Sequence, residues 1–522
     1  MQTKRKLLLT LKTFCIIVAV SSISANKKAS AQSIAPDEIY QQMVNNPALE
    51  KQTGENFCWQ AAYGMHRFVN NYELTKNTEW LDAGVMYYDF LIGKMLSDPD
   101  GYKGWIGEYQ YDSGYLQDAL VGDAILMAGI LDFCVLVLED KFLKAKYGNK
   151  ANSYIKTARK DFIEKWDFRK CWVDDAPYGS YIGFNKYLKE DNLKEWIVDP
   201  KVSRSGVSHP FNKQMDVAEV CLQLHRLTGE QFYWERAEQI YFTAKSHFQY
   251  FDNHYCWNYY EPLYPGDIDL ENSNTRHGVW VHPWRSGYQA GEVSQIVNAY
   301  HHGIVFDSVD IQRIINTNLE VMWNKNRVHP KYINSNGLGA DGDTTGLADF
   351  KRTYGHSNAV KNGGELWTAL LDFDQTIRDL YELRFNGDTT SPEYLSYKKT
   401  VLVHPPGFKR KYADDNVNVP VVDFTACSDL YLATVLPHKI PKNGESVIIC
   451  KSRNAGAISI DLYKTTGVKI TNLYKGKIEM DRNLIITWDG KDPAKKASFK
   501  GAYKIRWTSK GGYREFPIVI SN

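Results

Sequence analysis

A short turn between two amphipathic helical patterns occurs twice in this sequence, and it limits the chain to folds that stack helical hairpins. The first copy places Leu74-Thr75-Lys76-Asn77 before Trp80-Leu81-Asp82-Ala83, and the second places Leu227-Thr228-Gly229-Glu230 before Trp234-Glu235-Arg236-Ala237. Such a hairpin buries its apolar face only by packing against a neighbouring hairpin. We therefore expect an array of stacked hairpins.

Apolar residues recur at helical spacing from about residue 55 to 383, which predicts amphipathic helices. The clearest stripes are Met215, Ala218, Leu222 and His225; Val293, Ile296, Val297, Tyr300 and Ile304; and Leu366, Leu370, Phe373, Ile377 and Leu380. We expect a mainly α fold, an α/α toroid that is incomplete or has six hairpins, with functional loops at one end. The apolar stretch 119–138 contains Asp123 and Asp132 and predicts a helix buried on all sides rather than a membrane span.

The two ends of the chain differ from this helical middle. Residues 1–31 combine the basic cluster Lys4-Arg5-Lys6, the apolar run 14–20 and the small residues Ala29-Ser30-Ala31, which predicts a signal peptide and a secreted, cell-surface or periplasmic protein. The alternating runs 457–463, 484–488, 502–507 and 514–520 predict strands. We expect a catalytic toroid over 32–400, a connecting region over 401–440, and an immunoglobulin-like β-sandwich over 441–522.

Composition and charge exclude several classes of protein. With 43% hydrophobic and 24% charged residues the chain is globular. Without residues 1–31 it has 57 basic and 61 acidic residues, a net charge of −4, so no basic surface for nucleic acid is expected. The seven remaining cysteines lack zinc spacing and are expected to be buried thiols. We expect no cofactor, because Asp341, Asp343 and Asp349 lack the closing Glu of a calcium loop; a structural or charge-neutralising divalent cation stays open.

Segment 271–288 is the richest in groups that perform chemistry. It leads into a predicted helix and contains Arg276, His277, Trp280, His282, Trp284, Arg285 and Tyr288. Burying these polar groups without partners would cost about 1–3 kcal/mol each. We therefore favour a functional loop, with a surface loop that caps helices as the alternative.

Two further segments are candidates for the same cleft. His209 and Asn212 begin a helix one hairpin earlier, and alternate helix starts of a toroid face one cleft; alternatively, Asn212 only caps its helix. Trp105, Tyr109 and Tyr115 stand among carboxylates, which suits stacking on sugars and suits a helical core equally well.

These residue types fit β-elimination at a uronic acid, which removes the proton at C5 and expels the oxygen at C4. The enzyme must neutralise the sugar carboxylate and supply a base and an acid. Asn212 with Arg276 or Arg285 would bind the carboxylate. His277 and Tyr288 would share the base and acid roles, because a nearby cation favours the phenolate. The expected sugar contacts are His209, Trp280, His282, Trp284, Trp105, Tyr109 and Tyr115.

The order Asn212, His277 and Tyr288, with Arg276 or Arg285, resembles the Asn–His–Tyr(–Arg) order of the α/α-toroid polysaccharide lyases, which include chondroitin, hyaluronan, alginate and heparinase-like lyases. Unlike that group, this sequence has no large central β-sandwich. Signal peptide, toroid and short β tail together are similar to secreted ulvan lyases. The resemblance implies an anionic polysaccharide substrate, cleaved at a glucuronate or iduronate next to a sulfated rhamnose.

The tail resembles the immunoglobulin-like domains related to the flagellar hook-capping protein and the C-terminal sorting modules of type IX secretion. The resemblance rests on residues 460–467, 488–492 and 501–503. It implies export or surface attachment, with the type IX machinery as a partner.

Three other functions fit the same sequence. A glycoside hydrolase or unsaturated-uronyl hydrolase needs two carboxylates, and Asp112, Asp118, Asp216, Asp267, Asp269 and Glu271 are available. A uronyl C5-epimerase begins with the same proton abstraction. A glycan-binding surface protein without catalysis needs the aromatic residues and hydrogen-bond donors but no base.

Overall fold

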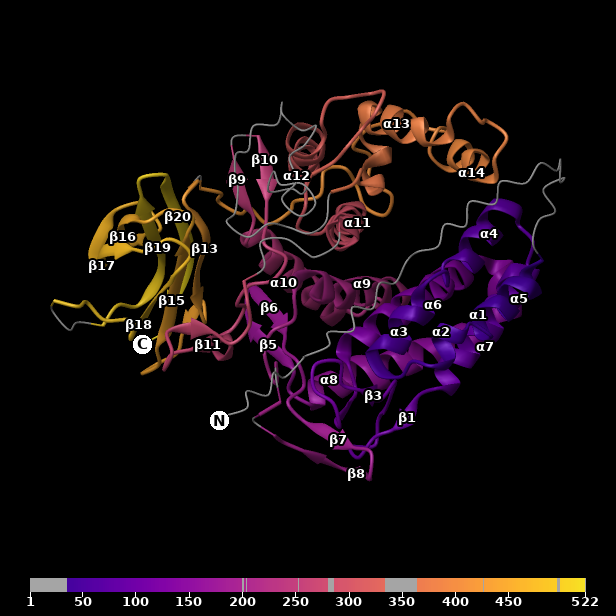
Figure 1. Cartoon of the computed structure of the whole chain (residues 1–522), viewed down its shortest axis with the longest axis horizontal. Helices are drawn as coiled ribbons and strands as arrows, with labels where there is room; N and C mark the ends of the chain where they lie inside the picture. The colour runs from indigo at the N-terminus through magenta and orange to yellow at the C-terminus, as the bar shows by residue number, and fades with distance from the viewer. Residues whose placement is uncertain are drawn as a thin grey trace, which may run out of the picture.

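The computed structural model describes residues 35–199, 201–202, 204–251, 253–279, 286–333, 364–425, 427–494 and 498–521. The predicted signal peptide therefore lies outside the described residues, as do Asp341, Asp343 and Asp349. The described chain consists of a helical body followed by a C-terminal β-sandwich (Figure 1).

The body is built from helices that pack as neighbours in space. The main helices are α3 (Gly54–Ala62), α4 (Arg67–Thr75), α5 (Glu79–Gly93), α6 (Leu120–Glu139), α7 (Lys141–Ala158), α9 (Phe211–Thr228), α10 (Gln231–Ser246), α11 (Ser286–His302) and α12 (Ser308–Asn316). Helices α3, α6, α9 and α11 form one row, in which each packs on the next; α7, α10 and α12 pack against α6, α9 and α11. Both repeated turns join antiparallel neighbours, α4 to α5 and α9 to α10, and each contains a left-handed residue, Lys76 and Gly229. The helical hairpins are thus confirmed, and their closure into a toroid stays a prediction.

Shorter elements complete the body. They are α1 (Pro36–Val44), α2 (Pro47–Glu50), α8 (Lys165–Phe168), α13 (Gln375–Glu382), α14 (Pro392–Thr400), the π-helical turns Arg159–Glu164 and Thr317–Met322, and the 3-10 turns Pro265–Asp267, Thr368–Asp372 and Leu383–Phe385. The strands are β1 (Leu96–Ser97), β2 (Lys103–Gly104), β3 (Gly107–Glu108), β4 (Leu116–Gln117), β5 (Trp172–Asp175), β6 (Tyr178–Tyr181), β7 (Tyr187–Lys189), β8 (Asn192–Ile197), β9 (Gln249–Phe251), β10 (His254–Cys256), β11 (Ile268–Asp269) and β12 (Asn274–Thr275).

Helix α6 is the centre of the body. Among the described helices it alone is long and apolar enough to cross a membrane, but most of its residues are packed inside the protein, as expected of a buried core helix. Two glycines let it approach α3 and the turn that follows α3. A Cβ atom on Gly129 would lie 2.6 Å from Met65 Sδ, and one on Gly122 would lie 2.9 Å from Cys58 Sγ.

A buried ionic network ties the start of α6 to α8. Lys165 Nζ lies 2.7 Å from a carboxylate oxygen of Asp118 and 2.7 Å from one of Asp123, and all three side chains are at most 1% exposed. Arg169 Nη1 donates to Asp118 at 2.8 Å, and Lys165 also donates to the Lys103 carbonyl at 2.9 Å. The network thereby fixes the loops that precede α6 on the helical body.

The C-terminal sandwich consists of two sheets, ordered β13-β15-β18 and β14-β20-β19-β16-β17. Its strands are β13 (Leu430–Leu436), β14 (Lys439–Ile440), β15 (Ser446–Ser452), β16 (Gly456–Lys464), β17 (Lys469–Ile478), β18 (Asn483–Trp488), β19 (Gly501–Ser509) and β20 (Gly512–Ile520). The four predicted strands are confirmed as β16, β18, β19 and β20. Strand β13 lies inside the segment predicted to be a connecting region, so the sheet begins before residue 441.

The sandwich packs directly against the helical body, on the side where β9, β10 and β11 lie (Figure 1). Ile268 of β11 shares a buried apolar cluster with residues of β13 and β15, namely Tyr431, Leu432, Leu436, Val447 and Ile449. The described cysteines are all free and buried, as expected for packed thiols. They are Cys58, Cys134, Cys171, Cys221, Cys256, Cys427 and Cys450.

Candidate functional site

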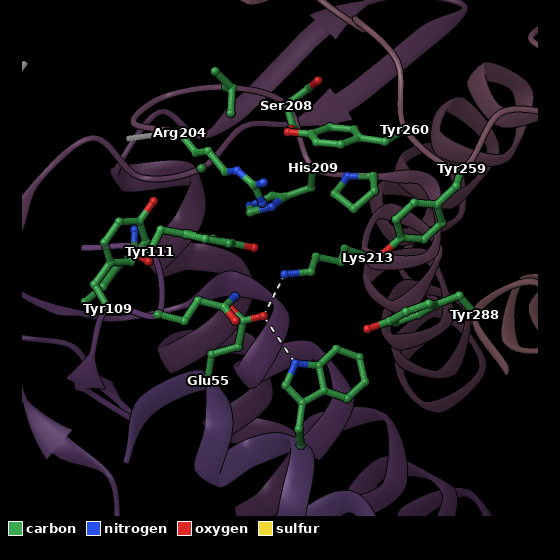
Figure 2. Close-up of a pocket in the computed structure, with 16 residues that line it drawn as sticks. Glu55, Tyr109, Tyr111, Arg204, Ser208, His209, Lys213, Tyr259, Tyr260 and Tyr288 are labelled. Atoms are coloured by element: carbon green, nitrogen blue, oxygen red, sulfur yellow. Dashed lines mark hydrogen bonds and ion pairs between the residues drawn. The ribbon is translucent and has the colours of Figure 1, made fainter. Parts of the chain in front are cut away.

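A cavity of about 460 Å³ lies where the starts of α3, α9 and α11 meet the loop between β3 and β4. Ligand pockets are typically about 300–1,000 Å³. Figure 2 shows side chains from all four segments pointing into this space. The lining residues are Glu55, Trp59, Tyr109, Gln110, Tyr111, Gln117, Gly183, Arg204, Val207, Ser208, His209, Pro210, Lys213, Tyr259, Tyr260 and Tyr288.

An ion pair between Lys213 and Glu55 lies at the base of the cavity. Lys213 Nζ is 2.6 Å from Glu55 Oε1, and Trp59 Nε1 donates to the same oxygen at 3.2 Å (Figure 2). Burial alone would raise the pKa of Glu55, but the Lys213 ammonium outweighs it and the pKa is lowered. Burial likewise opposes the charge of Lys213, and Glu55 nevertheless raises its pKa. Both groups are therefore charged at neutral pH.

His209 presents a neutral imidazole to the cavity. Burial, assisted by the nearby positive charge of Lys213, lowers the pKa of His209 to about 3. Its main chain is fixed, because its N–H donates to the Tyr181 carbonyl at 3.2 Å and its carbonyl accepts from Gln214 Nε2 at 3.1 Å. Its Nε2 atom is buried and has no hydrogen-bond partner among the described residues. The ring thus borders the cavity with one nitrogen that forms no hydrogen bond to the described residues.

Aromatic rings form most of the cavity wall. The rings of Tyr259 and Tyr288 are 5.3 Å apart, and they lie across the cavity from Tyr109 and Tyr111 (Figure 2). The Arg204 guanidinium lies 4.2 Å from the centroid of the Tyr111 ring. Aromatic faces beside cationic groups suit a ring-shaped ligand that carries negative charge.

Three of the predicted site residues, Tyr109, His209 and Tyr288, line this cavity. His277 does not line it. Its ring stacks on Tyr260 with centroids 3.8 Å apart, and its Nε2 lies 3.6 Å from Asp267 Oδ1. Because its side chain is 1% exposed, His277 lies behind the wall and supports it.

Arg276 and Asn212 also lie outside the lining. Arg276 donates to the carbonyls of Gly266 at 3.0 Å and Ser205 at 2.6 Å. Asn212 is 6% exposed, and its Oδ1 has no hydrogen-bond partner among the described residues. It does not cap its helix, because the residue at the N-cap of α9 is Pro210.

The remaining predicted sugar contacts lie elsewhere or outside the described residues. Trp105 donates to the Leu91 carbonyl at 2.8 Å and borders a separate cavity of about 490 Å³. Tyr115 donates to Asp199 Oδ2 at 2.6 Å. Trp280, His282, Trp284 and Arg285 fall in the segment that the structure does not describe.

Sequence reasoning missed several cavity residues. Lys213 directly follows Asn212 in the segment that was singled out, so a basic neighbour was the available signal. No signal in the sequence pointed to Glu55 or Arg204, because an isolated charged residue near a helix start or in a loop is common. Tyr259 and Tyr260 form an aromatic pair in an irregular segment, where no periodicity indicates which way a ring points.

A line of carboxyl groups extends along α9 away from the cavity. Burial, with the nearby Glu219, raises the pKa of Asp216 to about 8, and burial with Asp132 raises the pKa of Glu219 to about 7. In the neighbouring helix α11, burial also raises the pKa of Glu292 to about 8.

Within the described part of the chain, no three His, Cys, Asp or Glu side chains are placed to hold a metal ion.

Comparison with known proteins gives little further guidance. No family model matches the sequence, and no curated protein matches it. Among solved structures, the chain is similar to the Lin0763 protein from Listeria innocua, with 15% identity and a TM-score of 0.26 over 42% of this chain and 53% of that one. It is also similar to the glycoside hydrolase family 76 (mannosidase) Bt3792 from Bacteroides thetaiotaomicron, with 13% identity and a TM-score of 0.27 over 47% and 53%. This chain thus spans about half the length of each.

Proposed function

We propose that this protein is a carbohydrate-active enzyme that cleaves a uronic-acid polysaccharide, with ulvan favoured, by β-elimination. The observation that supports this most is the gathering of Tyr288, Lys213 and His209 around one aromatic cavity. Two cations, Lys213 and Arg204, suit an anionic sugar. Glu55 is the sole carboxylate among the described lining residues, and its pairing with Lys213 disfavours two-carboxylate hydrolysis in this cavity.

The proposed reaction assigns each group a role. The sugar carboxylate binds near Lys213 and Arg204, and their positive charge stabilises the negative charge that develops when the C5 proton leaves. Tyr288 is the base in this proposal, because its side chain lines the same cavity as the Lys213 ammonium (Figure 2). The Tyr288 oxygen takes the C5 proton, the electron pair of the C5–H bond forms the C4–C5 double bond, the C4–O bond breaks, and the departing oxygen takes that proton back from Tyr288. Neutral His209 orients the sugar by hydrogen bonding.

The residues behind the wall have supporting roles in this proposal. His277 holds Tyr260 by stacking, and Arg276 fixes the loops around Ser205. Lys213 takes the carboxylate-neutralising role that the lyase resemblance implies for the adjacent Asn212. The role predicted for Arg285 stays a prediction, because this residue lies outside the described residues.

The test is to incubate the purified protein with ulvan, alginate, chondroitin and pectin, and to follow ultraviolet absorbance of the unsaturated uronyl product together with new reducing ends. Absorbance that rises with the reducing ends supports a lyase, most strongly if ulvan gives the fastest rise. New reducing ends without absorbance contradict elimination.

A glycoside hydrolase is the second candidate function, and the carboxyl groups of α9 favour it. Asp216, with a pKa of about 8, is protonated at neutral pH as a general acid must be, and Glu219 stands three residues later. In that case Asp216→Asn would abolish the release of reducing ends, whereas the lyase proposal expects Asp216→Asn to leave a product with ultraviolet absorbance.

We also propose that the protein is exported, with the type IX machinery as partner. The support is the signal-like composition of residues 1–31 and the resemblance of the tail. Expression of the full chain in a host with and without this machinery, followed by assay of the culture medium, tests it; equal release from both hosts contradicts the partner.

A further inference from the structure

Two of the cavity tyrosines, Tyr259 and Tyr260, lie in a segment that belongs to no helix or named strand. Such a segment keeps its side chains in place only if other contacts fix its backbone. The residue before them, Asn258, is fully buried and faces the C-terminal sandwich instead of the cavity.

Two amide side chains of the body meet one backbone carbonyl of the sandwich. Asn258 Nδ2 donates to the carbonyl of Tyr431, in β13, at 2.7 Å, and Gln249 Nε2 donates to the same oxygen at 3.1 Å. Arg453, just after β15, donates in turn to Gln249 Oε1 at 3.1 Å. Asn258, Tyr431 and Gln249 are each at most 3% exposed. The hydrogen bonds between them therefore replace bonds to water that these groups lose on burial.

The same contacts continue to the start of α9. Asn258 Nδ2 also donates to Glu261, which pairs with the ring of His247. The His247 ring lies 5.5 Å from Phe516 of β20 and 5.6 Å from Phe211, the first residue of α9. The Phe211 N–H donates to the Tyr259 carbonyl at 3.2 Å. Lys213 follows two residues later. This set of contacts therefore joins the segment of Tyr259 and Tyr260 to the start of α9.

We propose that the C-terminal sandwich is a positioning unit of the candidate site, which holds Tyr259 and Tyr260 through the bond between Asn258 and the Tyr431 carbonyl. This role goes beyond the export function that the tail resemblance implies. This proposal rests on the proposed function in one respect only: it takes the cavity lined by Lys213 and Tyr288 as the functional site. Asn258 is a positioning residue, because it touches the segment and not the ligand.

The experiment compares Asn258→Leu with Asp175→Asn in the full-length chain. Asn258→Leu removes both amide donations at nearly constant volume. Asp175→Asn is the matched control, since Asp175 contacts the sandwich without touching Asn258 or the Tyr431 carbonyl: its carboxylate lies 2.9 Å from His438 Nδ1. Hydrogen–deuterium exchange measured by mass spectrometry should be at least about tenfold faster over residues 257–263 and 207–214 in Asn258→Leu, and unchanged there in Asp175→Asn.

Unchanged exchange in Asn258→Leu, or equal acceleration in both variants, would overturn the proposal. If Asn258→Leu does not fold, Glu261→Gln, which keeps the shape and removes the charge, is measured in its place with the same expectation. With any polymer that gives product, KM should rise several-fold while kcat stays within about twofold. If no polymer gives product, the proposed function fails, and the exchange result still decides the positioning role.

Discussion

Lys213 Nζ lies 2.6 Å from Glu55 Oε1, and this contact joins the starts of α9 and α3, which are 158 positions apart in the sequence. The pair therefore has two effects. It links α9 to α3, two helices of the row formed by α3, α6, α9 and α11. It also places a positively charged ammonium at the cavity.

Lys213→Met should lower both stability and activity. The Glu55 carboxylate would lose its counter-charge while both side chains are only about one-tenth exposed, which we expect to cost about 3 kcal/mol of unfolding free energy. The double variant Lys213→Met with Glu55→Gln should regain most of that stability and remain inactive, because the carboxylate-binding charge is still missing. Urea unfolding and turnover measure the two effects, and full activity in the double variant would show that the charge has no role in the reaction.

Tyr288→Phe should abolish turnover and leave sugar binding nearly intact, since it removes one hydroxyl and keeps the ring that packs against Tyr259. Product absorbance measures turnover, and calorimetric titration with the same polymer measures binding. Tyr259→Phe is the control and should keep most of the activity. A Tyr288→Phe protein that retains most of its turnover would exclude Tyr288 as the base.

His209 should make the protein less stable in acid. The unfolded chain protonates this histidine near pH 6.5, whereas in the folded chain burial lowers the pKa of His209 to about 3. Between these values the unfolded state binds more protons, so the free energy of unfolding falls as the pH drops from 6.5 toward 3. His209→Gln should flatten this part of the curve. Melting temperatures of both proteins between pH 7 and 4 check it, and parallel curves would contradict the burial of a neutral ring.

Lys165→Met should destabilise the body strongly, because it leaves Asp118 and Asp123 buried with one cation fewer. We expect a loss of about 3–5 kcal/mol in unfolding free energy. Lys146→Met is the control: its pair with Asp82 is nearly half exposed and should contribute less than about 1 kcal/mol. Chemical denaturation of both variants makes the comparison, and similar small losses would mean that the buried network is not needed for stability.

Local patterns predicted the longest periodic elements of this fold, although the stripe from Leu366 to Leu380, predicted as one helix, is divided between the 3-10 turn Thr368–Asp372 and α13. The spacing of Met215, Ala218 and Leu222 predicted α9, and the alternation after residue 456 predicted β16 and β19, because periodicity reports which side of an element is buried. The apolar stretch around Asp123 was correctly assigned to a core helix. Strand β13 was missed although its sequence is almost wholly apolar and buried, because a short continuous apolar run does not show the alternation by which the other strands were predicted.

Only part of the cavity lining was predictable. His209 and Tyr288 stand at helix starts and reach the cavity, and so does Tyr109 just after β3, whereas Asn212 stands at a helix start and does not line the cavity. His277 has suitable chemistry but stacks behind Tyr260, and nothing in the sequence indicates this orientation. The partnership of Lys213 with Glu55 depends on how distant helices pack, which the local patterns of a single sequence do not specify.

The glycines of α6 make the candidate site sensitive to changes outside its cavity. A Cβ atom on Gly122 would lie 2.9 Å from Cys58 Sγ and 3.6 Å from the Cα atom of Glu55, so Gly122→Ala would press directly on α3. Glu55 stands in the first turn of α3, so a displacement of this helix would shift the partner of Lys213. Variation at this glycine would thus alter the candidate site, although the altered residue does not line its cavity.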